Sequence, residues 1–125
     1  MADATSLKGT QILIVEDEFL IADDLARAVR HAGGIPVGPV GTVDGAEELV
    51  RNRPVDAAIV DLNLRGRMAA EFVKRLSATK VPCLIVSGYG ADGFPESVSG
   101  IPRLEKPVSP ASVVQALAKQ LVRAA

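Results

Sequence analysis

Five short apolar runs alternate along this chain with segments whose apolar residues recur at helical spacing. The runs cover residues 11–15, 35–43, 57–61, 82–87 and 101–105. Two of them are apolar at every position (12–15 and 83–86), which is typical of strands that are buried on both faces of a parallel sheet. Repeated strand–helix alternation predicts an α/β fold, a doubly wound five-stranded parallel sheet with helices on both faces.

The helical segments begin and end at recognisable signals. Gly33 provides a stop for the first segment. Residues 44–47 read Asp-Gly-Ala-Glu, the form of a capping box that opens the second. Ser109 as N-cap and Pro110 at the first helical position open the last. The fourth segment, residues 90–100, contains three glycines and a proline, so we expect any helix there to be short and labile.

Length, charge and cysteine content narrow the class of protein. A chain of 125 residues has the length of one domain. A net charge of −1 gives no global field that would recruit nucleic acid or an anionic membrane. The lone Cys83 excludes an internal disulfide and suits a reducing compartment, and no run approaches the roughly 18 apolar residues of a membrane span. We therefore expect a cytoplasmic protein with a lead-in over residues 1–10 and a single domain over 11–125, without an output domain.

Polar and charged residues stand at the ends of four apolar runs. Glu16 and Asp17 follow the first run, Asp61 ends the third, Ser87 ends the fourth and Lys106 follows the fifth. The carboxyl ends of parallel strands meet at one edge of the sheet, where ligands bind in such folds, so these side chains should converge. One acidic residue at a strand end is usually a solvated carboxylate or a helix cap, but four complementary strand ends are harder to explain in that way.

A cluster of carboxylates is costly unless a cation compensates it. Oxygen ligands in small number suit Mg²⁺. An ordinary zinc site is excluded, because the chain has one His and one Cys.

Four motifs, in order, resemble a known family: ILIVEDE (12–18), AIVDLNL (58–64), LIVSGYG (84–90) and LEKP (104–107). They are similar to the motifs of the receiver domain of two-component response regulators. The resemblance extends over nearly the whole chain and implies a flavodoxin-like (CheY-like) fold.

The resemblance implies that Asp61 is the phosphoacceptor, which takes a phosphoryl group from a phosphohistidine on a partner histidine kinase or phosphotransfer protein. Lys106 would contact one phosphoryl oxygen and the Ser87 hydroxyl another. The peptide bond from Lys106 to Pro107 is similar to the family's cis peptide. The implied Mg²⁺ ligands are Glu16, Asp17, Asp61 and the backbone carbonyl of Asn63.

The sequence departs from the family pattern at positions that bear on mechanism. Arg103 stands where many receivers have an aromatic ring that swings inward on activation, and Tyr89 is a hypothetical replacement for that ring. Asn63 and Tyr89 flank the expected path of attacking water, so both should tune the lifetime of the phosphate. Arg65 and Arg67 follow the phosphoacceptor; we interpret them as a solvated basic loop, with docking to an acidic kinase surface as the alternative.

These observations predict a stand-alone signalling switch in which phosphorylation changes binding to a target protein or drains phosphate from a kinase. The chain should be a monomer or weak dimer, and not a conventional enzyme, since it would only capture and lose its own phosphate. One alternative is a receiver-like interaction module that is never phosphorylated. Another is a small aspartyl-phosphate phosphohydrolase, but such an enzyme needs a second Asp at the position of Asn63.

Overall fold

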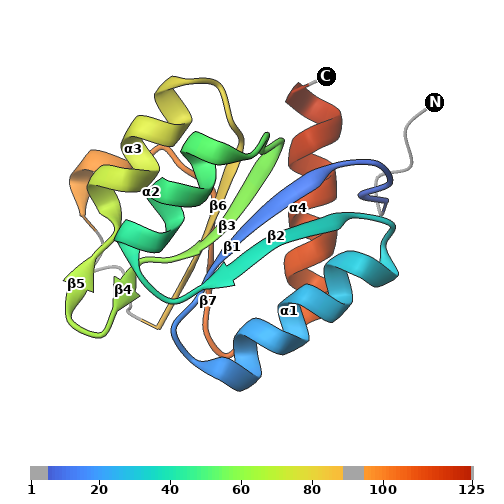
Figure 1. Ribbon diagram of the computed structural model, residues 1–125, viewed down its shortest axis with the longest axis horizontal. Coiled ribbons are helices and arrows are strands. Elements are labelled where there is room, and N and C mark those ends of the chain that lie inside the picture. Colours follow the sequence, from blue (N-terminus) through green and yellow to red (C-terminus); the bar gives the residue numbers. More distant parts are fainter. Residues whose placement is uncertain (1–5, 89–94, 125) are drawn as a thin grey trace.

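A single parallel sheet forms the centre of the molecule. The computed structural model describes residues 6–88 and 95–124. The strand order across the sheet is β2 (Ile35–Val40), β1 (Gln11–Val15), β3 (Ala57–Asp61), β6 (Cys83–Ser87) and β7 (Arg103–Glu105). Every neighbouring pair is parallel. The predicted doubly wound five-stranded sheet is confirmed (Figure 1).

Helices cover both faces of this sheet. α1 (Phe19–His31) and α4 (Pro110–Ala124) pack on one face, and α2 (Val43–Asn52) and α3 (Ala70–Ala78) on the other (Figure 1). The fourth helical segment, as far as it is described, contains only the 3-10 turn η2 (Glu96–Val98). In the described part of the chain, no helix combines the length and the apolar character that a membrane span requires.

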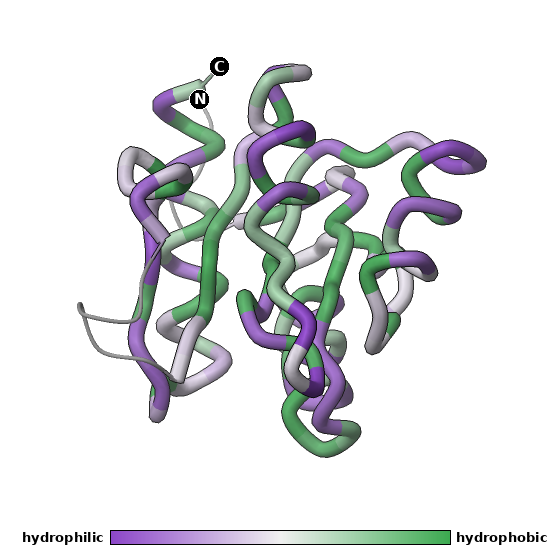
Figure 2. The backbone as a smooth tube through the Cα atoms, turned by 90° about the vertical axis from the view of Figure 1, so that its left-hand side faces the viewer, coloured by the Kyte–Doolittle hydropathy of each residue, from purple (hydrophilic) through white to green (hydrophobic). Residues whose placement is uncertain are grey.

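The two faces of the central strands supply two separate cores. Along β1, Leu13 and Val15 belong to the core under α2 and α3, whereas Ile12 and Ile14 belong to the core under α1 and α4. This alternation follows from the two-residue period of a strand. Because both faces are covered, all five residues of β3 and of β6 are buried. Hydrophobic stretches of the backbone accordingly run through the middle of the molecule in Figure 2.

The ends of the elements correct several details of the sequence prediction. The second apolar run, expected over residues 35–43, forms a strand only as far as Val40, and its last residue, Val43, begins α2. The N-cap of α2 is Thr42, whose Oγ1 accepts a hydrogen bond from the Gly45 N–H at 3.0 Å, so the predicted capping box that starts at Asp44 is wrong. The predicted cap of α4 is confirmed, because Ser109 Oγ accepts from the Ser112 N–H at 3.1 Å.

A two-stranded hairpin, which the sequence did not predict, follows β3. Its strands are β4 (Asn63–Leu64) and β5 (Arg67–Met68), paired antiparallel. The two residues between them, Arg65 and Gly66, have φ of 53° and 87°. Positive φ at both positions is the signature of a type I′ turn, which matches the twist of a hairpin. The residues after Asp61 thus form a defined element at the carboxyl edge of the sheet.

Candidate functional site

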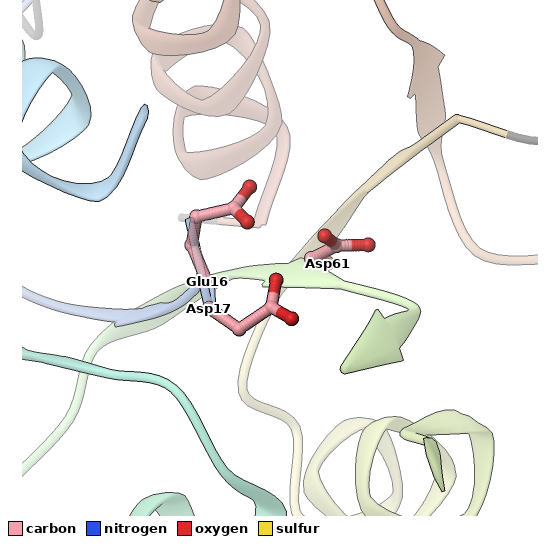
Figure 3. Close-up of side chains that lie close together, drawn as sticks. All are labelled: Glu16, Asp17 and Asp61. Carbon is pink, nitrogen blue, oxygen red and sulfur yellow. The ribbon is translucent and has the colours of Figure 1, made fainter. Parts of the chain in front are cut away.

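Three carboxylates converge at the carboxyl edge of the sheet. Glu16 and Asp17 follow β1, and Asp61 is the last residue of neighbouring β3. One carboxylate oxygen from each of the three lies within 4.8 Å of the other two, and the three side chains are drawn together in Figure 3. They are the described side chains that could together hold a metal ion.

Lys106 lies between two of these acids. Its Nζ donates to Glu16 Oε1 at 2.8 Å and to Asp61 Oδ2 at 3.0 Å. The three side chains are largely buried, with exposed fractions of 19% for Lys106, 2% for Glu16 and 8% for Asp61. Burying charges carries a desolvation cost that close pairing offsets. The site therefore depends on the positive charge of Lys106.

Burial and pairing shift the pKa values of this group in definite directions. Burial raises the pKa of the Glu16 carboxyl above its ordinary value, and the hydrogen bond from Lys106 offsets this only in part. For Lys106, burial acts to lower the pKa, but hydrogen bonds and charge from Glu16 and Asp61 outweigh it and raise the pKa overall. Lys106 is therefore a permanent cation near neutral pH.

Backbone N–H groups orient the two buried carboxylates. The Glu18 N–H donates to Glu16 Oε2 at 3.1 Å, and the Asn63 N–H donates to Asp61 Oδ1 at 3.1 Å. Each oxygen of Asp61 thus faces a donor, one from the backbone after β3 and one from Lys106. Such preorganised donors fix the direction in which a carboxylate faces.

A pocket of about 350 Å³ opens beside Asp61. Charged and polar groups dominate its lining: Asp17, Glu18, Asp61, Asn63, Arg65, Gly88 and Lys106. Asp61 is therefore accessible from this pocket although its side chain is mostly buried.

Two further predicted site residues, Ser87 and Arg103, lie on β6 and β7. Ser87 is buried at the end of β6, and its carbonyl accepts from the Lys106 N–H at 2.8 Å. The Lys106–Pro107 bond is cis. Arg103 is exposed at the start of β7. Tyr89 lies outside the described residues.

The hairpin brings one unexpected cation to the acids. Arg65 Nε lies 3.7 Å from Asp17 Oδ2, and Arg67 pairs with Asp44 at 3.2 Å. The sequence favours a solvated basic loop here, and both guanidinium groups are indeed exposed, yet each has a carboxylate partner. No sequence signal could have found the contact to Asp17, because it depends on the turn at Arg65 and Gly66.

Fold and site together define a class of protein: a doubly wound α/β domain with an acidic cluster and a lysine at the carboxyl edge of its sheet. The family model described as response regulator receiver domain matches residues 12–118. The chain belongs to this family. It is thus a receiver domain, as the sequence motifs predict.

Known proteins agree with this assignment. The solution structure of SdrG from Sphingomonas melonis Fr1 is similar, with 40% identity and a TM-score of 0.77 over 90% of this chain and 96% of that one. A BeF3-activated conformation of SdrG, from Pseudomonas melonis Fr1, has 39% identity and a TM-score of 0.73 over 92% and 98%.

A curated relative is longer than this chain. The transcriptional regulatory protein PdtaR of Mycobacterium tuberculosis (strain H37Rv) is 26% identical over an alignment of 119 residues, which covers 92% of this chain but 58% of PdtaR. The chain therefore spans little more than half of that relative's length.

Proposed function

We propose that Asp61 is the phosphoacceptor of this receiver. The observation that carries the proposal is its position: Asp61 lies on the open pocket while Lys106 and the Asn63 N–H hold its two oxygens. A carboxylate oxygen of Asp61 forms a bond to phosphorus as the phosphorus–nitrogen bond of a phosphohistidine breaks. The electron pair of that bond stays on the imidazole, which becomes the neutral leaving group once it holds one proton.

The carboxylates fit a divalent cation. One oxygen of each carboxylate lies within 4.8 Å of the other two, and oxygen donors of this kind suit Mg²⁺. We assign Glu16, Asp17 and Asp61 to this cation, with the backbone carbonyl of Asn63 as a further ligand. Bound Mg²⁺ would neutralise the charge that spreads over the phosphoryl oxygens during transfer.

Lys106 and Ser87 complete the site in this proposal. Lys106, which now bridges Glu16 and Asp61, pairs with one phosphoryl oxygen as a point charge. The Ser87 hydroxyl donates to another. The Ser87 carbonyl accepts from the Lys106 N–H, which holds the two residues side by side. Arg103 and Tyr89 remain candidates for residues that transmit or tune the change.

The biological role follows from the family. We propose that a sensor histidine kinase or phosphotransfer protein supplies the phosphoryl group in the cytoplasm. Residues 11–125 act as one switch domain whose output is altered protein binding or the removal of phosphate from a kinase. Its own chemistry is limited to the capture and loss of phosphate at Asp61.

The test is intact-mass analysis after incubation with acetyl phosphate, with and without Mg²⁺. We expect one phosphoryl adduct that requires Mg²⁺ and is absent from Asp61→Asn. Asp56→Asn is the matched control, since Asp56 accepts from the Gln11 N–H at the opposite edge of the sheet and should leave the adduct unchanged. An adduct that survives Asp61→Asn would refute the assignment. No adduct in any variant would favour an interaction module that is never phosphorylated.

A further inference from the structure

We propose that Arg65 is a counter-ion built into the acidic site. It neutralises Asp17 while the site has no divalent cation, competes with that cation for Asp17, and so raises the cation concentration at which the site fills. The inference rests on the proposed function, because it takes Asp17 to be a ligand of that cation.

The hairpin holds Arg65 in place. Arg65 and Gly66 form the turn, and the Gly66 N–H donates to Asn63 Oδ1 at 2.9 Å, which closes it. Leu64, the residue before the turn, is buried in the core under α2 and α3. The position of Arg65 is thus set by its neighbours and not by its own long side chain.

Contacts farther along the hairpin fix it to the body of the domain. Arg67 pairs with Asp44 of α2 at 3.2 Å. The Ala69 N–H donates to the Leu62 carbonyl at 2.8 Å, and both of these residues are buried. The hairpin is therefore anchored on both sides of its turn, with Arg65 on the pocket that contains Asp17 and Asp61.

The two cations divide the acids between them. Lys106 pairs with two of them: its Nζ lies 2.8 Å from Glu16 Oε1 and 3.0 Å from Asp61 Oδ2. Arg65 pairs with the third, since its Nε lies 3.7 Å from Asp17 Oδ2. Three carboxylates thus share two positive charges, which leaves the cluster one charge short of neutral and still able to attract a further cation.

The contact to Asp17 is the one that a cation can displace easily. Arg65 is 81% exposed and Asp17 is 14% exposed, so the guanidinium can move into solvent without burying a new surface. An ion pair whose cation is this exposed is weak, because water competes for the guanidinium. A divalent cation on Asp17 repels the guanidinium at short range, so the two cannot both be bound at full strength.

The test is a Mg²⁺ titration of the unphosphorylated protein, followed by calorimetry and by the shifts of backbone amide signals. At low ionic strength we expect Arg65→Gln to bind Mg²⁺ roughly two- to five-fold more tightly than the wild type. Arg65→Lys should stay close to wild type. The gain in Arg65→Gln should shrink as monovalent salt is added, because salt screens exposed charges.

Arg67→Gln is the matched control, since it removes the same charge from the same hairpin but from a different partner, Asp44. Its Mg²⁺ affinity should change far less than that of Arg65→Gln. An unchanged or weaker affinity in Arg65→Gln, or an equal gain in Arg67→Gln, would overturn the inference.

A second pair of variants separates this inference from the proposed function. In an Asp17→Asn background, Arg65→Gln should have no effect on Mg²⁺ affinity, because the two residues act on the same contact. If Asp17→Asn binds Mg²⁺ as well as wild type, the proposed cation site itself is wrong and the inference fails with it. If Asp17→Asn loses binding and Arg65→Gln does not gain it, only the role of Arg65 is wrong.

Discussion

Glu16 is a buried acid, and its burial disfavours the ionised form of its carboxyl. Burial raises the pKa of its carboxyl, and hydrogen bonds from Lys106 and from the Glu18 N–H only partly compensate. A raised pKa means that the folded state binds the proton more tightly than the unfolded state does. The contribution of Glu16 to the free energy of unfolding therefore falls as pH rises from the ordinary value of 4.5 through the raised pKa of Glu16.

It follows that Glu16→Gln should be more stable than wild type at neutral pH in the absence of divalent cations. The advantage should disappear as pH falls below the raised pKa, because wild-type Glu16 is then neutral as well. Urea unfolding at several pH values in EDTA measures this. Glu48→Gln, which changes an exposed acid on α2, is the control and should show no such advantage. A Glu16→Gln protein that is less stable at pH 7 would contradict the account.

Cys83 illustrates a residue whose chemistry is suppressed by its position. It is buried at the start of β6, and burial raises the pKa of its thiol to about 12. The reactive thiolate is therefore scarce at neutral pH. We expect Ellman's reagent at pH 8 to react with the native protein only as fast as the chain unfolds, and at once in denaturant. Rapid labelling of the native protein would show that Cys83 is accessible.

At the level of elements, the short connections between helices and strands limit which substitutions the fold accepts. Gly34 lies between α1 and β2, and a Cβ there would meet Val29 Cγ1 at 2.9 Å and Leu7 Cβ at 3.1 Å. We expect Gly34→Ala to lower the free energy of unfolding by about 1–3 kcal/mol, as overpacked cores do.

Gly100→Ala is the comparison for this substitution, because nothing lies within 4 Å of a Cβ built on Gly100. It should change stability by about 0.5 kcal/mol or less. Urea denaturation curves of both variants measure the difference. Equal free energies of unfolding for Gly34→Ala and Gly100→Ala would contradict the close contacts expected of a Cβ at position 34.

Elements with a clear hydrophobic pattern could be predicted from the sequence. Features that depend on local hydrogen bonds, such as a helix start or a turn, could not. The continuous apolar runs predicted β1 and β6, because burial on both faces requires apolar residues at every position. The start of α2 was misplaced because Thr42 and Asp44 are both good caps, and the sequence does not show that the Thr42 hydroxyl accepts from the Gly45 N–H. The hairpin was missed because its turn places a non-glycine residue, Arg65, at positive φ.

At the scale of the whole molecule, topology explains why a site could be predicted at all. Glu16 and Lys106 are 90 positions apart in the chain, yet the strand order places them in direct contact. The rule that parallel strands have their carboxyl ends at one edge of the sheet was sufficient to predict that these two residues lie near each other. The distances, the pairing of Lys106 and the second cation at Arg65 needed the structure, because they depend on side-chain packing.

A receiver works by shifting between two conformations, so the phosphoryl group must interact differently with each. In our account, Ser87 and Lys106 supply that difference. We expect Ser87→Ala to accept phosphate at Asp61 but to show smaller changes in backbone amide signals on BeF3 treatment than wild type. Ser97→Ala, at the exposed turn η2, is the control and should respond fully. A full response in Ser87→Ala would assign the coupling to other residues.

We propose that Asp61 itself forms the acyl phosphate. Borohydride reduces an aspartyl phosphate to homoserine, so treatment of the phosphorylated protein followed by peptide sequencing by mass spectrometry locates the modified residue. Our account predicts homoserine at position 61 and unmodified acids at positions 16 and 17. Reduction at Glu16 or Asp17, with Asp61 intact, would contradict it.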